Sequence, residues 1–174
     1  MKSLFVTTLF LFSFINAELT HFERGIDLYS QRANESVGLK ANKKFIDQAI
    51  DQFFKAMKTP GGELEAGVYL LKCYYYKGKF VADNNDTKKE IFSEGKSLGE
   101  QLIGRHPQSV AAYYWYLVNL GSWAEIYGTM SAAREGVAGT MRKLSKKIID
   151  IDSGYNDGGG YFMLGAVHFK SPYI

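Results

Sequence analysis

The chain has 174 residues, of which 46% are hydrophobic and 22% are charged. This composition is typical of a globular protein and excludes an intrinsically disordered chain, and the length suits one domain with a sizeable core. The formal net charge of +3 comes from short, dispersed basic clusters. These clusters fit solvated helix faces better than a continuous surface for nucleic acid, so no nucleic-acid partner is expected.

The first 17 residues have the order of a secretory signal peptide. Lys2 precedes the uncharged run Leu4–Ile15, and the small residue Ala17 follows shortly after it. The run is shorter than the roughly 20 residues that a membrane-spanning helix needs, and it has no polar face. We therefore expect residues 1–17 to be removed on export and residues 18–174 to form the mature domain. No cysteine follows the expected cleavage point directly, so the sequence does not predict a lipoprotein.

Helical periodicity continues through the mature chain. Proline occurs only at positions 60, 107 and 172, and no stretch alternates apolar and polar residues as a half-buried strand would. Segments rich in glycine, proline, asparagine and aspartate separate the helical stretches. The pattern predicts helices near residues 20–35, 41–57, 63–81, 87–105, 108–127, 131–150 and 159–169.

The first helix of each successive pair repeats one apolar pattern, at positions i, i+3, i+4 and i+7. The sets start 45, 46 and 48 residues apart. They are Phe22, Gly25, Ile26, Tyr29; Gly67, Leu70, Leu71, Tyr74; Tyr113, Tyr116, Leu117, Leu120; and Tyr161, Leu164, Gly165, His168. Any amphipathic helix has this internal spacing, so the regular separation of the sets is what indicates a repeat.

The last set, in the segment YFMLGAVH, resembles the W-x₂-L-G-x₂-Y pattern of tetratricopeptide repeats, whose unit has about 34 residues. The segment Ala49-x₃-Phe53-x₂-Ala56 is a weaker echo of the second helix of such a repeat. We therefore expect an all-α fold of tetratricopeptide-like helical-hairpin repeats. About three and a half extended repeats would form a short superhelix.

The predicted helix 108–127 carries large aromatic residues on several of its faces, including the run YYWY at residues 113–116. Successive residues on a helix point about 100° apart, so these rings cannot share one face. We expect one packing stripe of Tyr113, Tyr116, Leu117, Leu120 and Ala124, and a second of Trp115, Asn119 and Trp123. The helix should therefore be enclosed on three sides. Cys73, the only cysteine, lies in an apolar stretch and is expected to be a small buried hydrophobe.

No convincing catalytic motif is present. His21, His106 and His168 lie far apart in the sequence, and His168 is expected in the core. The segment DIDSGYNDGGG resembles a calcium loop in its Asp150-x-Asp152 spacing. However, Gly154 and Tyr161 occupy positions where that motif needs an oxygen ligand and glutamate. A turn between repeats is therefore the preferred interpretation of this segment. No metal or other cofactor is predicted.

The concave surface of the predicted superhelix is the expected binding site. In this repeat class it is lined by positions at fixed offsets from the packing stripe of each first helix. We expect a partner- or ligand-binding surface that comprises Lys72, Tyr75, Tyr76, Tyr114, Val118, Phe162 and Phe169. An exposed aromatic concavity suits a peptide, a partner helix or an apolar ligand. If extended helices close over that surface, the same residues are core.

Residues 107–174 resemble a known family. The similar motifs are YWY leading into NLG and WAE, and the joint Y-x-D-G-G-x₄-L-G. They resemble the tetratricopeptide-like T-component (TatT) family of TRAP transporters. Over residues 20–105 the resemblance is only one of topology. Members of the family continue with further helices after the SP turn, so we expect the chain to be truncated at its C-terminus.

The resemblance implies a non-enzymatic periplasmic protein that binds the solute-binding subunit of a TRAP transporter. A hydrophobic small molecule in the concave surface and a homo-oligomer are further expectations. Two alternatives stay open. One is a general envelope scaffold for protein–protein interaction without a transport role, and the other is a hydrolase or transferase that uses His168.

Overall fold

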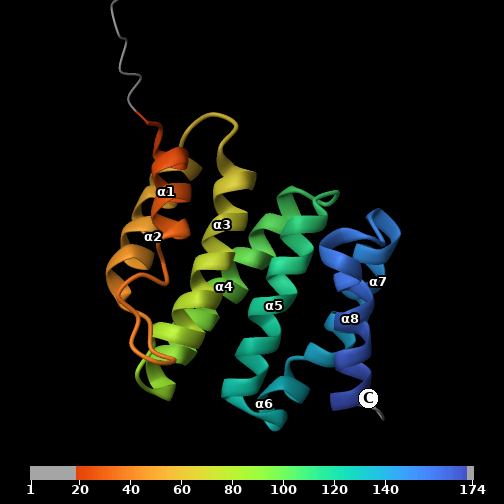
Figure 1. Ribbon diagram of the computed structural model, residues 1–174. Helices are drawn as coiled ribbons and strands as arrows, with labels where there is room; N and C mark the ends of the chain where they lie inside the picture. Colours follow the sequence, from red (N-terminus) through yellow and green to blue (C-terminus); the bar gives the residue numbers. More distant parts are fainter. Residues whose placement is uncertain (1–18, 172–174) are drawn as a thin grey trace, which may run out of the picture.

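A computed structural model describes residues 19–171 of the chain, and this part is all-helical (Figure 1). The expected all-α class is confirmed. No helix in the described range is both long and apolar enough to cross a membrane. The expected signal peptide, residues 1–17, lies outside the described residues. The helices are α1 (His21–Ser30), α2 (Lys43–Met57), α3 (Glu63–Tyr76), α4 (Asn85–Arg105), α5 (Val110–Tyr127), α6 (Thr129–Arg134), α7 (Val137–Ile151) and α8 (Tyr155–Lys170), and a π-helical turn, η1 (Lys77–Val81), extends α3.

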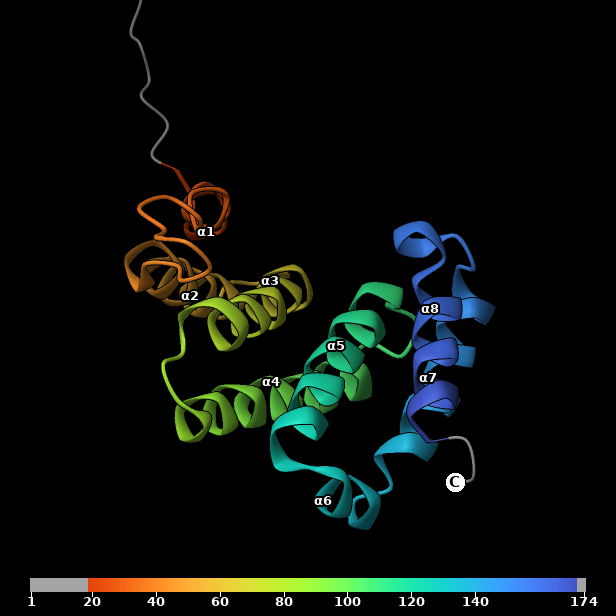
Figure 2. The same ribbon diagram turned by 60° about the horizontal axis from the view of Figure 1, so that its bottom comes forward.

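Consecutive helices pack against one another as antiparallel pairs (Figures 1 and 2). The most extensive contacts join α1 to α2, α4 to α5, and α7 to α8. Residues 106–109 join α4 to α5 and residues 152–154 join α7 to α8, and such short connections favour antiparallel neighbours. The connection between α1 and α2, residues 31–42, is longer. The predicted helical hairpins are therefore present over the described residues.

Side-chain caps explain where several of these helices begin. Thr20 and Glu23 form a reciprocal capping box at the start of α1. Asn84 accepts a hydrogen bond from the backbone N–H of Thr87 at the start of α4. Ser109 accepts one from Ala112 at the start of α5. Each cap satisfies an N–H group that the first helical turn leaves without a partner.

Two predicted helices differ from the structure. The predicted helix 20–35 is longer than α1, which ends at Ser30. The predicted helix 131–150 is interrupted, because Gly136 adopts a left-handed conformation with φ of 63° and separates α6 from α7. The predicted helix 159–169 agrees with the regular part of α8, although the assigned helix begins earlier, at Tyr155. Its first turn contains Asn156, Asp157 and Gly158 in left-handed conformations, so regular helix starts only at Gly159.

The N-terminal core forms where α1, α2 and α3 meet. Ala49, Phe53 and Ala56 are buried there, in agreement with the repeat-like pattern of the second helix. The Phe53 ring stacks on Tyr69 with a centroid separation of 5.0 Å. Cys73 is fully buried, as expected, and burial raises the pKa of its thiol far above the ordinary value. This cysteine therefore behaves as an apolar core residue.

Helix α5 is enclosed by other helices on several sides, which explains why its own aromatic residues occupy several of its faces. It contacts α3, α4, α6, α7 and α8. Tyr113, Tyr116, Leu117 and Leu120 are buried along the predicted stripe. The amide of Asn119 is also buried and donates to the carbonyl oxygens of Leu71 at 3.0 Å and Trp115 at 2.9 Å. The first of these hydrogen bonds joins α5 to α3.

The packing stripe predicted for α8 is wrong. Tyr161, Gly165 and His168 are exposed and Leu164 is only half-buried. The buried face instead consists of Gly159, Gly160, Met163 and Val167. The left-handed turn at residues 156–158 sets the direction in which α8 leaves α7, and it brings Gly160 against Ile148 of α7. His168 is therefore a surface residue.

Candidate functional site

A cavity of about 590 Å³ lies among the C-terminal helices. Its walls come from α5, α6, α7 and α8, and the end of α3 with η1 completes them. Figure 2 shows how α5, α6, α7 and α8 are arranged. Most lining residues are apolar or small. They include Tyr75, Tyr114, Trp115, Leu117, Val118, Gly121, Ala124, Ala132, Val137, Ala138, Met141, Phe162, Met163, Ala166 and Val167. Its volume and lining are typical of a small-molecule site.

One end of the cavity is aromatic. Tyr114 is half-buried, and its ring contacts Trp115 and Tyr155 edge to face, both with a centroid separation of 5.5 Å. The Tyr114 hydroxyl accepts a hydrogen bond of 2.8 Å from the Asn156 amide. A Cβ atom added to Gly159 would lie 2.5 Å from the Tyr114 ring. Glycine at position 159 therefore allows α8 to approach this ring closely.

The opposite end of the cavity carries charge. Glu125, near the end of α5, accepts hydrogen bonds from Lys170 at 2.6 Å and from Lys79 at 2.9 Å. These two bonds hold the pKa of the Glu125 carboxyl below its ordinary value, so the carboxylate is ionised at neutral pH. Arg142 also donates to the carbonyl oxygen of Ser171, which lines the cavity beside Lys170.

These contacts show that α5 and α8 run in the same direction along the cavity. The start of α5 meets the start of α8 at Tyr114 and Asn156, and their ends meet at Glu125 and Lys170. Eleven residues separate Tyr114 from Glu125, which corresponds to about 16 Å along a helix. The cavity therefore changes from aromatic to charged over that length.

The structure brings four of the predicted binding residues together. Tyr75, Tyr114, Val118 and Phe162 all line the cavity. Tyr75 packs on Trp115 with ring centroids 6.2 Å apart. Phe162 contributes to the wall although 72% of the residue is exposed. Whether these residues bind a ligand stays a prediction.

The other three predicted residues lie elsewhere. The Lys72 ammonium lies over the Tyr69 ring at 4.1 Å, and burial lowers the pKa of Lys72. Tyr76 faces the N-terminal helices, where its hydroxyl donates to the carbonyl oxygen of Arg32 at 3.0 Å. Phe169, on α8, is 87% exposed and is not among the residues that line the cavity. The uniform offsets of an ideal repeat do not hold for these helices, so residues at equivalent positions point to different surroundings.

Sequence reasoning missed much of the cavity lining. Lys79 lies in the π-helical turn η1, and Ala132 and Ala138 lie on either side of the break between α6 and α7. The sequence identified Glu125 only as part of the WAE motif and did not indicate that it lines a cavity. The accumulation of alanine and glycine over residues 128–139 was the available signal, because small side chains leave space between helices.

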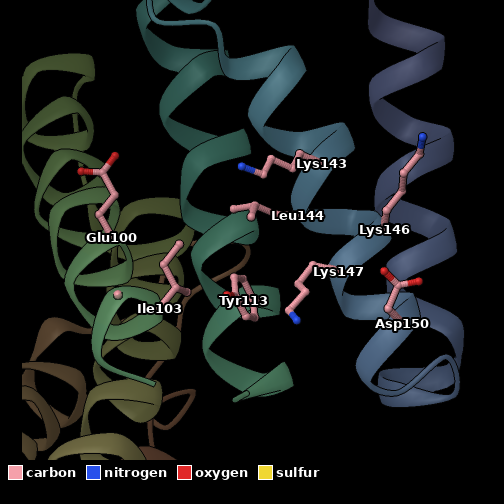
Figure 3. A pocket seen from close by; sticks show the side chains of 9 residues that line it. Glu100, Ile103, Tyr113, Lys143, Leu144, Lys146, Lys147 and Asp150 are labelled. Atoms are coloured by element: carbon pink, nitrogen blue, oxygen red, sulfur yellow. The ribbon is translucent and has the colours of Figure 1, made fainter. Parts of the chain in front are cut away.

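A second hollow lies between α4, α5 and α7 and has more charge around it. Ile103, Tyr113 and Leu144 contribute its apolar residues. Figure 3 shows Lys143 and Lys147 reaching toward it from α7, with Glu100 across on α4. Lys143, Lys146 and Lys147 around this hollow form one of the short basic clusters that were expected on solvated helix faces, and Lys143 is exposed there.

The described residues contain no group of three or more metal-ligating side chains. In the segment that resembles a calcium loop, Asp152 accepts a hydrogen bond of 3.0 Å from the backbone N–H of Gly154. This contact is typical of a turn. The three histidines are not gathered, since His21 contacts Gln52, His106 contacts Glu63 and His168 lies on the exposed side of α8.

No protein-family model matches the chain, and no curated protein matches it significantly.

Proposed function

We propose that this protein is a non-enzymatic binding module whose cavity among α5–α8 holds an apolar small molecule. The cavity of about 590 Å³ supports this function most directly, because its walls combine aromatic and aliphatic side chains over most of its length. Tyr75, Tyr114, Val118 and Phe162 provide the contact surface. Binding would be driven by removal of apolar surface from water.

The same proposal includes a protein partner, the solute-binding subunit of a TRAP-type transporter in the periplasm. The resemblance of residues 107–174 to the T-component family suggests this partner. The exposed residues Tyr161, Phe162 and Phe169 on α8 are consistent with it, because exposed apolar surface is a common feature of docking sites. Phe162 belongs both to this surface and to the cavity wall. A docked partner would therefore contact the cavity directly.

The helical hairpins are interpreted as tetratricopeptide-like repeats in a short superhelix. The alternative role, a general envelope scaffold, would use the exposed face of α8 but would not need the cavity. Binding of a small molecule therefore discriminates between the two roles. An enzymatic role through His168 is not proposed, because that side chain lies on the exposed side of α8 away from the cavity lining.

A blocked cavity tests the proposal. Ala166 lines the cavity from α8, and its neighbour Gly165 has open space where a Cβ atom would be. Nile red, an uncharged hydrophobic dye, should bind the wild-type protein saturably. Ala166→Trp should weaken that binding by about tenfold or more, the loss of roughly 1.4 kcal/mol of contact free energy. Gly165→Trp is the matched control and should bind the dye as the wild type does.

Thermal unfolding of each variant shows whether it is folded. If Ala166→Trp does not fold, Ala138→Trp introduces the same obstruction from α7. Equal dye binding by the wild type and both blocking variants would refute the cavity as the site. Absence of saturable binding to the wild type would refute the proposal for apolar ligands altogether.

A further inference from the structure

The charges that line the cavity among α5–α8 lie at one end only. Lys79, Glu125 and Lys170 are the only ionisable acids or bases among the described residues of its lining, apart from the tyrosines. Both lysines donate to the one carboxylate. Every other wall is apolar, aromatic, small or hydroxyl-bearing. The cavity therefore has the polarity of an amphiphile, with a head region and a body region.

We infer that the ligand of this cavity is a free amphiphile with a single carboxylate headgroup, held at Lys79 and Lys170, and an apolar body that extends toward Tyr114. This inference rests on the proposed function and specifies the chemical class of its ligand.

The side chains at the head region indicate that the headgroup of the ligand is negatively charged. Two ammonium groups face one carboxylate, which leaves one positive charge in excess. Each lysine ammonium has three donor hydrogens, and the contact with Glu125 uses one of them. Arg142 adds a further cation beside this end through its hydrogen bond to Ser171. A carboxylate can therefore bind both lysines without displacing Glu125.

The residues that line the rest of the cavity indicate that the body of the ligand is an apolar chain. Val118, Met141, Met163 and Val167 line the cavity, and their side chains contain only carbon, hydrogen and sulfur atoms. The distance of about 16 Å along α5 between the aromatic and charged ends suits a chain and not a compact polar solute. Methionine side chains adapt to chains of different shape. The aromatic end, at Tyr114 and Phe162, would contact the far end of the body.

A matched set of ligands separates the inference from the proposed function. Dodecanoate is the carboxylate probe, dodecanol the uncharged one and dodecyltrimethylammonium the cationic one. The two ionic probes are used below their micelle concentrations and dodecanol below its solubility limit. Calorimetry at pH 8 and low salt should give tighter binding of dodecanoate than of dodecanol, by about three- to fivefold, and the weakest binding for the cation. Added sodium chloride should reduce the preference, because salt screens exposed charges.

Two substitutions should change this preference in opposite directions. Lys170→Gln removes a cation and should weaken dodecanoate binding by about threefold, whereas Glu125→Gln removes the competing anion and should strengthen it by a similar factor. Neither should change dodecanol binding. Lys147→Gln, in the second hollow of Figure 3, is the matched control and should change neither affinity. If the three charged residues only stabilise the fold, both substitutions should instead weaken dodecanoate binding.

Each outcome has a defined meaning. Equal binding of dodecanoate and dodecanol would overturn the headgroup assignment but leave an apolar cavity. Tighter binding of dodecyltrimethylammonium than of dodecanoate would overturn the headgroup assignment and would indicate that Glu125 binds a cationic headgroup. No binding of any probe would refute the proposed function itself. A lipid headgroup offers similar chemistry, so co-sedimentation with anionic phospholipid vesicles, together with no binding of free dodecanoate, would overturn the assignment to a free amphiphile.

Discussion

Tyr114 and Tyr116 leave the same helix on different sides, and their surroundings differ accordingly. Tyr116 is 3% exposed, packs against Gly99 of α4 and donates its hydroxyl to Glu100 at 3.2 Å. Tyr114 is half-buried between the cavity and the start of α8. Two positions apart on the same helix, one tyrosine ring therefore lies in the core and the other lines the candidate site.

Replacing each tyrosine by alanine should show this difference. Tyr116→Ala should lower the free energy of unfolding by about 3–5 kcal/mol, because a large buried ring is lost and a cavity remains. Tyr114→Ala should cost only about 1–2 kcal/mol, because its ring is partly exposed and its space opens into an existing cavity. Urea unfolding measures both values. Equal losses would show that Tyr114 is core as well.

The same two residues show what the sequence could predict at this scale. Helical spacing placed Tyr116 on the buried stripe and Tyr114 on another face, and both placements are confirmed. Spacing could not reveal the pair Lys79 and Glu125. These residues are 46 positions apart and lie on elements whose contact depends on the packing of the whole chain.

At the scale of the helix, small residues determine how closely neighbours approach. A Cβ atom added to Gly99 of α4 would lie 2.4 Å from the Tyr116 ring, and one added to Gly95 would lie 2.2 Å from the Asn119 amide oxygen. Both positions lie on the face that contacts α5. The absence of side chains there allows α4 and α5 to form the most extensive helix contact in the described chain.

Two glycine substitutions test this explanation. Gly99→Ala should destabilise the protein by about 1–3 kcal/mol, because the added methyl group overpacks the contact between α4 and α5. Gly139→Ala, in α7, meets open space and should stabilise it by about 0.5–1 kcal/mol through helix propensity. Thermal and urea unfolding should agree on the two signs. Stabilisation by Gly99→Ala would mean that α4 can move away from α5 without cost.

Helix starts were predicted closely both at α3, where the predicted start at residue 63 agrees with Glu63 although no side chain caps the helix, and at two helices that begin with a capping residue. Ser109 and Asn84 lie at such starts, and the predicted helices there begin within two residues of α5 and α4. The course of α8 was not predictable, because Asn156 and Asp157 adopt left-handed conformations that residues other than glycine rarely adopt. The hydrogen bond from Asn156 to Tyr114 contributes to holding this turn, and it joins residues 42 positions apart.

At the scale of the whole molecule, the cavity results from the parallel course of α5 and α8. The helical hairpins could be predicted because they depend on local periodicity and, at α4–α5 and α7–α8, on short connections. The cavity depends instead on two breaks in the chain. The left-handed Gly136 separates α6 from α7, and the turn at Asn156 redirects the chain into α8. The sequence therefore predicted aromatic residues for a binding surface without predicting the wall that encloses them.

The outer face of α8 is where a protein partner would meet the cavity. Phe169 on α8 is 87% exposed, and Leu39, on the connection between α1 and α2, is 92% exposed. Figure 1 shows α1 and α2 at the opposite end of the helix array from α8. If the proposed partner is the solute-binding subunit of a TRAP transporter and docks on α8, Phe169→Ser should reduce co-purification with that subunit by about tenfold, the effect of losing a central aromatic contact. Leu39→Ser is the matched control and should leave capture unchanged. Quantitative pull-down with purified components measures both effects. Capture that is equally sensitive to both substitutions would place the interface elsewhere, and no capture by the wild-type chain would contradict the proposed partner.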